Sequence, residues 1–260
     1  MTTAINAVND DDPDITVIVT CYNEEALIAA TLTNVTGALE EVGRSYEIIV
    51  VDDVSTDASV AKVREYMETH PSLPIRLKTN TVNLGLATNY IDTAFEARGK
   101  YYRLCCGDDA EPKEVLIKIF RHIGRADIVI PYQNQREVRG KSHFRKFLSN
   151  TFTLLVNFIG GYKIKYYNGL AIHLRYNVMR WHPSSYGFGF QADMITRLLD
   201  EGASYVQIGS SSIDRKAGGS SALTLRNLLS VTHTLLELAI RRVRRALYGR
   251  TMPKPREMME

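Results

Sequence analysis

The feature that most constrains the fold is a regular alternation of two sequence patterns over residues 14–131. Short runs rich in Ile, Val and Tyr are typical of buried strands, and each is followed by a run with apolar residues at helical spacing. The strand-like runs cover residues 15–21, 46–51, 75–80, 101–106 and 126–131. Strands that alternate with helices in this way predict an α/β fold, with a mostly parallel sheet flanked by helices.

Polar segments follow four of the predicted strands. Because the strands are expected to be parallel, their carboxyl ends share one edge of the sheet, where ligands bind in folds of this class. Each segment alone is ordinary turn chemistry, but together they predict a single polar site. The segments are Tyr22–Glu25, Asp52–Asp57, Asn83–Gly85 and Gly107–Glu111.

Two adjacent carboxylates, Asp108 and Asp109, end the fourth strand-like run. Their mutual repulsion favours a nearby positive charge, and hard oxygen ligands suit Mg²⁺ or Mn²⁺. The alternative is a solvated turn that caps the helix beginning at Pro112. A dinucleotide site is not expected, because no Gly-x-Gly-x-x-Gly follows the first strand.

Taken together, these motifs resemble the nucleotide-sugar half of family 2 glycosyltransferases, which have the Rossmann-like GT-A fold. The resemblance implies a nucleoside diphosphate-sugar donor, with a UDP-sugar preferred over a GDP-sugar, and a divalent cation as cofactor. Asp53, Tyr22 and Glu24 would hold the base and ribose, while Asp109, helped by Asp108, would coordinate the metal. The other donor-site candidates are Thr20, which stands where many members carry proline, and Ser55, Asn83 and Gly85.

Positive charge is concentrated in two segments of a chain whose formal net charge is only +3. Residues 136–180 hold nine Lys or Arg against one Glu, and residues 241–260 hold seven against two acids. An acidic body with two basic segments indicates an anionic partner, such as membrane lipid or a phosphorylated acceptor. No nucleic-acid recognition motif accompanies this charge.

Residues 144–159 mix apolar and polar side chains, and the run is too polar and too short to span a bilayer. It suits an amphipathic element at a membrane interface or an ordinary helix packed on the sheet. His143–Ser149 followed by Tyr166–Ala171 is similar to the acceptor region of transferases that make dolichyl- and polyprenyl-phosphate sugars. That resemblance implies acceptor-binding roles for Arg145, Ser149, Asn168 and Gly169. Ser220, in a later segment that resembles a loop of lipid-phosphate members, is a further acceptor-binding candidate.

Two further residues complete the catalytic set with Asp109. Asp193 matches the acidic residue that accepts the acceptor proton in inverting family members, although an acid in the first turn of a helix is the alternative. Arg215 lies in a segment that resembles the loop closing over the donor diphosphate, although a flexible surface loop is the alternative.

The sequence therefore predicts a metal-dependent, inverting hexosyltransferase with a polyprenyl-phosphate or related lipid-linked acceptor. The alternatives are transfer to a sugar hydroxyl of a glycan and a non-catalytic sugar-nucleotide scaffold. The expected parts are a disordered tail (1–13), a nucleotide-sugar-binding half (14–131), an acceptor-binding half (132–220) and an amphipathic basic C-terminal helix with its tail (221–260).

The C-terminal helix could dock on the sheet, pair with a second subunit in a homodimer, or lie on an anionic membrane surface. Three cysteines without metal-ligand spacing and a polar N-terminus without a signal sequence predict a cytoplasmic protein. Its expected place is peripheral, on the inner face of the membrane.

Overall fold

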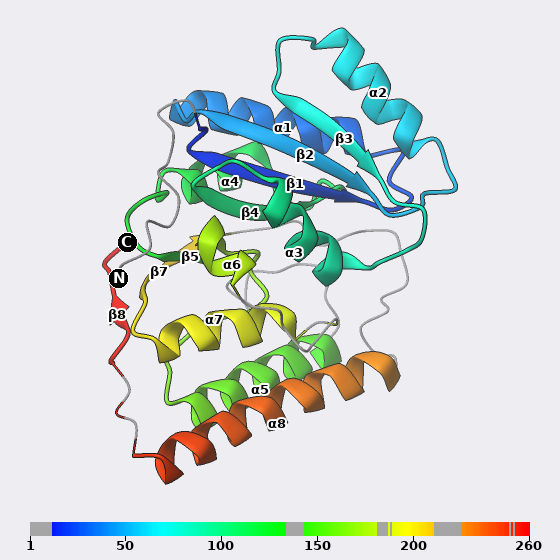
Figure 1. The fold of residues 1–260 in the computed structure, drawn as a ribbon. Helices are drawn as coiled ribbons and strands as arrows, with labels where there is room; N and C mark the ends of the chain where they lie inside the picture. The colour runs from blue at the N-terminus through cyan, green and yellow to red at the C-terminus, as the bar shows by residue number, and fades with distance from the viewer. Residues whose placement is uncertain are drawn as a thin grey trace, which may run out of the picture.

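One eight-stranded sheet organises the part of the chain that the structure describes (Figure 1). The computed structural model describes residues 12–133, 143–180, 187, 189–210, 225–249, 251 and 253–260. The strand order is β3-β2-β1-β4-β6-β5-β7-β8, and only β6 runs antiparallel to its neighbours. This mostly parallel sheet confirms the predicted α/β fold class.

The first half of the chain follows the predicted alternation closely. β1 pairs in parallel with both β2 and β4, so the carboxyl ends of these strands lie side by side. The elements are β1 (Ile15–Cys21), α1 (Ile28–Val42), β2 (Tyr46–Asp52), α2 (Ser59–Thr69), β3 (Ile75–Thr79), α3 (Leu86–Glu96), β4 (Tyr101–Cys106), α4 (Lys113–Phe120) and β5 (Ile128–Gln133).

The second half extends the same sheet, which the sequence did not predict. The short strand β6 inserts between β4 and β5, and β7 continues the parallel part beside β5. A three-residue strand carries too little periodicity to be read from sequence. The elements are α5 (His143–Gly160), β6 (Ile172–Leu174), α6 (Arg175–Met179), α7 (Phe190–Asp200), β7 (Ser204–Ser210), α8 (Leu225–Leu247) and β8 (Arg256–Glu257).

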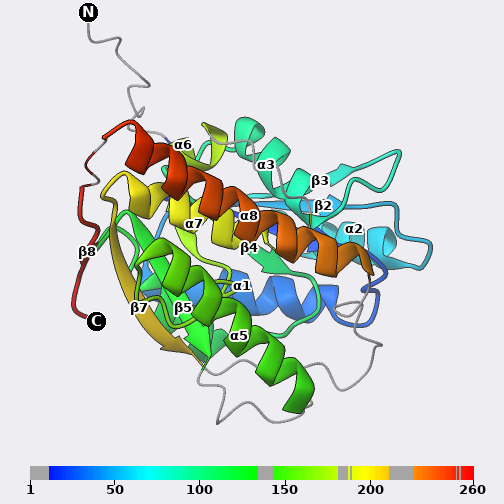
Figure 2. The same ribbon diagram turned by 90° about the horizontal axis from the view of Figure 1, so that it is seen from below.

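Helices cover both faces of the sheet. Figure 1 shows α1, α2 and α4 on one face and α3, α6 and α7 on the other, and each face has its own apolar core. Helices α5 and α8 lie side by side beyond α7 and form the outermost layer (Figure 2). Among the described helices, none is both long enough and apolar enough to cross a membrane.

A buried histidine in β6 makes stability depend on pH. His173 is 3% exposed, and burial lowers its pKa from 6.5 to about 4. Between these pH values the unfolded chain binds a proton that the folded chain excludes, so stability falls as the pH falls. We expect His173 to remove about 3 kcal/mol of stability between pH 7 and pH 4. Denaturant unfolding at pH 7 and pH 4 measures the fall in the free energy of unfolding between the two pH values. This fall should be about 3 kcal/mol smaller in His173→Gln than in the unchanged chain. An equal fall in both proteins would contradict a depressed His173 pKa as its cause.

Candidate functional site

Residues with strained backbone mark one edge of the sheet. Asn23, Val54 and Asp109 follow β1, β2 and β4 with φ of 57°, 69° and 50°. Leu170, with φ of 51°, precedes the antiparallel β6 and so lies at the same edge. These four are all the non-glycine residues with positive φ in the described part of the chain. Such conformations cost about 1–3 kcal/mol each and cluster at functional sites.

Asp53 organises the loop that follows β3. Its carboxylate accepts the backbone N–H groups of Leu84 and Gly85, both at 2.9 Å, and the side-chain amide of Asn80 at 2.8 Å. Burial raises the pKa of Asp53, but hydrogen bonds from Asn89 and the other donors outweigh burial and lower it. The side chain is therefore ionised at neutral pH and holds the 83–85 turn against the end of β2.

The loops after β1 and β2 are joined by side-chain hydrogen bonds. The backbone N–H of Asn23 donates to the Ser55 hydroxyl at 3.0 Å, and the Asn23 side chain accepts the Thr56 N–H at 2.8 Å. The backbone N–H of Glu24 donates to the Ser59 hydroxyl at 2.8 Å. Tyr22 remains 54% exposed beside this frame. The structure thus brings together the predicted donor-site segments, with an exposed aromatic ring at their border.

Asp108 and Asp109 differ in their surroundings. The Asp109 backbone N–H donates to the Thr31 hydroxyl at 2.9 Å, and its carboxylate accepts from the Asn34 amide at 2.7 Å, so α1 holds this residue. Burial raises the pKa of Asp108 most, backbone hydrogen bonds from Ala110 and from its own N–H lower it in part, and the carboxylates of Glu111 and Asp109 add smaller increases. Burial therefore has the largest effect on the ionisation of Asp108.

Arg103, a buried arginine that supports the segment carrying Asp108 and Asp109, was not predicted from the sequence as a site residue. Arg103 in β4 is fully buried, donates to the Cys105 sulfur at 2.8 Å, and forms an ion pair with Glu111 at 2.6 Å. An arginine within an apolar strand is rarely buried without a partner, so its place in Tyr101–Cys106 was a readable signal. The Arg103–Glu111 pair anchors the segment that carries Asp108 and Asp109.

The predicted acceptor turn lies at the same edge. A side chain at Gly169 would collide with the Pro131 carbonyl oxygen, so only glycine fits there. The backbone N–H of Leu170 donates to the Gln191 side chain at 3.1 Å, which ties the turn to the start of α7. The buried Asn168 side-chain oxygen has no hydrogen-bond partner among the described residues. Ser149, in α5, is partly buried.

Asp193 lies in the first turn of α7 and is 2% exposed. Its carboxylate pairs with Arg197, at 3.0 Å, and with Arg241 of α8, at 3.2 Å. No sequence pattern signals the second pair, which joins residues 48 positions apart. Arg215, Ser220 and the side chain of Arg145 lie outside the described residues, so their predicted roles stay predictions.

Val54 provides a test of the strain at this edge. Replacing it with glycine, which adopts positive φ without a steric penalty, should raise the free energy of unfolding by about 1 kcal/mol. Val82→Gly is the matched control, because Val82 is exposed and lacks positive φ; this change should destabilise by about 0.5–1 kcal/mol. Denaturant unfolding measures both, and a loss of stability in Val54→Gly would argue against strain at this position.

Comparison with known proteins identifies the chain's relatives. Dolichol-phosphate mannosyltransferase of Pyrococcus furiosus is 31% identical over 138 residues, which are 52% of this chain and 38% of that protein. The structure of glucosyl-3-phosphoglycerate synthase from Mycobacterium tuberculosis superposes with a TM-score of 0.67 at 16% identity, covering 87% of this chain and 80% of that one.

Mannosyltransferase PcManGT from Pyrobaculum calidifontis, in complex with GDP-Man and Mn²⁺, superposes with a TM-score of 0.59 at 18% identity, covering 94% of this chain and 77% of that one. These likenesses confirm the predicted GT-A fold. The chain spans less than half the length of the curated relatives it matches.

The family model described as glycosyl transferase family 2 matches residues 16–182. The match includes the strained edge, the Asp53 loop, the Asp108–Asp109 pair and the turn before β6. The predicted family is thereby confirmed, and the chain belongs to glycosyl transferase family 2.

Proposed function

We propose that the chain transfers a sugar from a nucleoside diphosphate-sugar to a polyprenyl phosphate or related lipid-linked acceptor, with inversion at the anomeric carbon. The observation that carries the proposal is the single edge at which the Asp53 loop, the Asp108–Asp109 pair and the Gly169 turn meet. In the reaction, an oxygen of the acceptor phosphate forms the new bond to the anomeric carbon. The bond from that carbon to the donor diphosphate breaks, and the nucleoside diphosphate leaves.

The donor side uses the loops after β1, β2 and β3. The exposed ring of Tyr22 is placed to stack on a base, and the frame of Asn23, Ser55 and Asp53 fixes the loops beneath it. Because the side chain of Asp53 already serves the 83–85 turn, it shapes the base and ribose subsite mainly through that turn. Glucosyl-3-phosphoglycerate synthase was solved in complex with UDP, and PcManGT was solved in complex with GDP-Man. The test of the donor therefore includes both uridine and guanosine nucleotides.

The carboxylates after β4 fit a divalent cation. Their oxygens are hard ligands, and the pKa of Asp108 is raised chiefly by burial, with smaller contributions from Glu111 and Asp109; a cation at this carboxylate would offset both effects. No group of three or more His, Cys, Asp or Glu side chains in the described part of the chain is arranged to hold a metal. Asp108, with Asp109 beside it, would therefore share the ion with donor phosphate oxygens, as is usual for Mg²⁺. When bound, the ion supplies Lewis-acid stabilisation of the leaving diphosphate.

The surroundings of Asp193 favour a phosphate acceptor over a sugar hydroxyl. A hydroxyl acceptor benefits from a general base, whereas a phosphate acceptor is already ionised at neutral pH. Asp193 is buried between Arg197 and Arg241, which commits its oxygens to ion pairs. We therefore assign Asp193 a positioning role that joins α7 to α8. The Pyrococcus relative named for dolichol phosphate supports the same acceptor class.

Asp193→Asn tests this assignment. The assay is run at a temperature at which circular dichroism shows that the variant is folded. Its kcat for lipid-dependent nucleotide release should then stay within about tenfold of the kcat of the unchanged chain. Loss of a general base would lower kcat by about 10²–10⁴. A fall of that size without unfolding, together with loss of the acidic limb of the pH profile, would return Asp193 to a catalytic role and favour a sugar-hydroxyl acceptor.

The proposed function is tested by release of nucleoside diphosphate from donor sugars in the presence of Mn²⁺. The purified chain should release nucleotide faster when a short polyprenyl phosphate is present. Donor binding without release, with lipid phosphate and with glycan acceptors alike, would favour a non-catalytic scaffold. The same assay on variants tests the proposed division into a donor half (14–131) and an acceptor half (132–220). Substitutions in the donor half should change the KM for the nucleotide sugar, and substitutions in the acceptor half should change the KM for the lipid phosphate.

A further inference from the structure

The outermost layer of the molecule turns apolar side chains toward solvent. On α8 they recur at intervals of three, four or seven residues and so share one face, opposite the buried Thr234 and Leu238. On α5 the exposed apolar side chains likewise lie opposite the buried Val156. The exposed fractions are 51–84% for Leu229, Leu236, Ile240, Val243 and Leu247 of α8 and for Phe147, Leu154 and Phe158 of α5.

These two apolar stripes form one face, because α5 and α8 pack side by side (Figures 1 and 2). A surface helix normally turns its polar side outward. Here α8 directs Arg241 and Arg242 inward, onto Asp193 and Asp200 of α7. The polarity of the helix is therefore inverted, and an exposed apolar face of this kind marks an interaction surface.

Charge around the face is positive. Helix α5 contains no Asp or Glu, and α8 contains only Glu237 against five arginines. On an ideal helix Arg244 falls at the border of the apolar stripe, and its side chain is exposed. An apolar face rimmed by cations complements an anionic bilayer, which offers acyl chains and phosphate groups together. Two copies of the same face would instead bring arginines against arginines.

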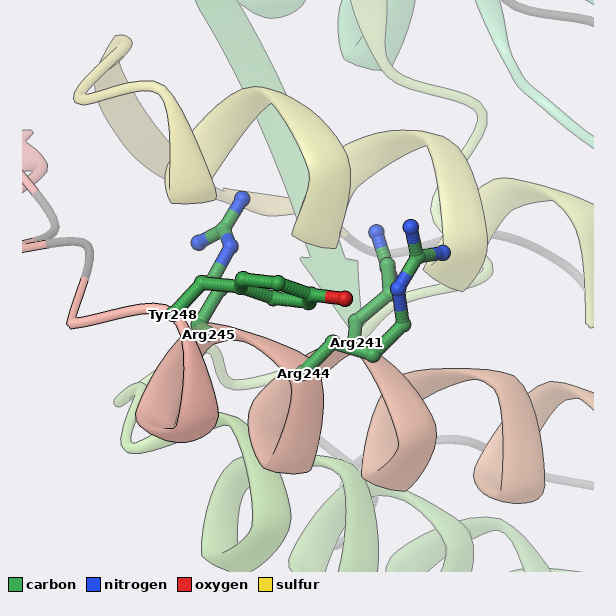
Figure 3. Close-up of a pocket in the computed structure, with 4 residues that line it drawn as sticks. All are labelled: Arg241, Arg244, Arg245 and Tyr248. Carbon is green, nitrogen blue, oxygen red and sulfur yellow. The ribbon is translucent and has the colours of Figure 1, made fainter.

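A basic pocket adjoins the stripe near the C-terminal end of α8, at the end of the molecule opposite the carboxyl ends of β1 and β2 (Figure 1). It has a volume of about 510 Å³ and is lined by Arg241, Arg244, Arg245 and Tyr248. Figure 3 shows the four side chains on the side of α8 that faces α7, with the Tyr248 ring lying along the helix among the arginines. Arg241 and Arg245 are engaged by Asp193 and Asp200 of α7, so Arg244 and the Tyr248 hydroxyl are the lining groups placed to donate to phosphate oxygens.

We propose that the outward face of α5 and α8 docks on an anionic bilayer, and that this pocket holds a lipid phosphate headgroup. The inference rests on the proposed function, since a polyprenyl-phosphate acceptor resides in a membrane. The bound headgroup is separate from the acceptor, because the pocket lies away from the edge that holds the donor site. In this orientation α5 and α8 lie on the membrane surface, and the sheet lies farther from the membrane than these two helices.

Vesicle co-sedimentation of the unliganded full chain tests the docking. The chain should bind vesicles of phosphatidylcholine with about 30% phosphatidylglycerol more tightly than phosphatidylcholine alone. Phe158→Ser/Ile240→Ser should weaken binding by about tenfold or more, because both side chains would enter the acyl region. Phe95→Ser is the matched control on α3, where Phe95 is 55% exposed, and it should bind like the unchanged chain.

The pocket has its own variant. Arg244→Gln should weaken binding to the anionic vesicles about fivefold and leave binding to phosphatidylcholine unchanged. Arg64→Gln, on the exposed side of α2, is its control and should change neither. Equal effects of Arg244→Gln and Arg64→Gln would refute the headgroup site.

Unchanged binding by Phe158→Ser/Ile240→Ser would refute the docking face. So would a dimer of the unchanged chain that this double variant converts to monomer, because the face would then be a subunit interface. No donor or acceptor is present in these assays, so failure of docking is distinguishable from failure of glycosyl transfer.

Discussion

Asp108→Asn is expected to lower kcat for nucleotide release by about 10³-fold with Mn²⁺ present. The carboxylate lies among Glu111 and Asp109, and burial together with these neighbours raises its pKa. A cation held there would stabilise the leaving diphosphate by several kcal/mol, and about 4 kcal/mol corresponds to 10³ in rate. An asparagine keeps the shape of the side chain and removes the charge, so the loss reports on the cation site.

Asp109→Asn serves as the paired variant, because one Asp109 oxygen is already occupied by the Asn34 amide. We expect it to lower kcat by about tenfold, mainly through a weaker hold on the loop. Asp92→Asn, on the exposed side of α3, is the matched control and should leave the rate unchanged. Titrating Mn²⁺ in the release assay of each of the three variants gives the apparent metal affinity of each. A larger loss in Asp109→Asn than in Asp108→Asn would reverse the assignment of the metal ligand.

Asp200→Asn is expected to cost about 3–5 kcal/mol of stability. The Asp200 side chain is fully buried at the end of α7 and pairs with Arg242 at 2.8 Å and Arg245 at 3.2 Å. It also accepts a hydrogen bond from the Tyr162 hydroxyl. Removing the charge leaves guanidinium groups of α8 without their counterion, and breaking a buried pair in this way costs several kcal/mol.

Denaturant unfolding measures the loss, which corresponds to a fall in Tm of about 10 °C for a chain of this size. Glu201→Gln is the neighbouring control, because Glu201 and its partner Arg180 are partly exposed and such pairs contribute about 0–1 kcal/mol. If Asp200→Asn cost no more than Glu201→Gln, the α7–α8 ion pairs would contribute little, and the fixed placement of α8 would need another source.

The donor half could be predicted from the sequence because its signals are local. Each strand and the helix after it are read from ten to fifteen consecutive residues, and the parallel order then places the following loops at one edge. Tyr22, Asp53, Gly85 and Asp108 were found in this way, and the structure places their segments together. Their chemical roles remain predictions for the variants above to test.

The second half was less readable because its elements depend on distant partners. β6 has three residues and exists through its pairing with β4 and β5. The pairing of Asp193 with Arg241 joins α7 to α8, and no spacing in the sequence announces it. A basic C-terminal helix was expected within residues 221–260, and α8 (Leu225–Leu247) lies there. The sequence did not show that Arg241 and Arg242 turn inward while Leu236 and Ile240 face outward.

The most direct test of the central claim is release of nucleoside diphosphate by the purified chain from a panel of UDP- and GDP-sugars with Mn²⁺, with and without a short polyprenyl phosphate. We expect release from one donor that rises with the lipid phosphate and is lost in Asp108→Asn. Donor binding with no lipid-stimulated release, while a glycan acceptor stimulates it, would contradict the lipid-phosphate acceptor.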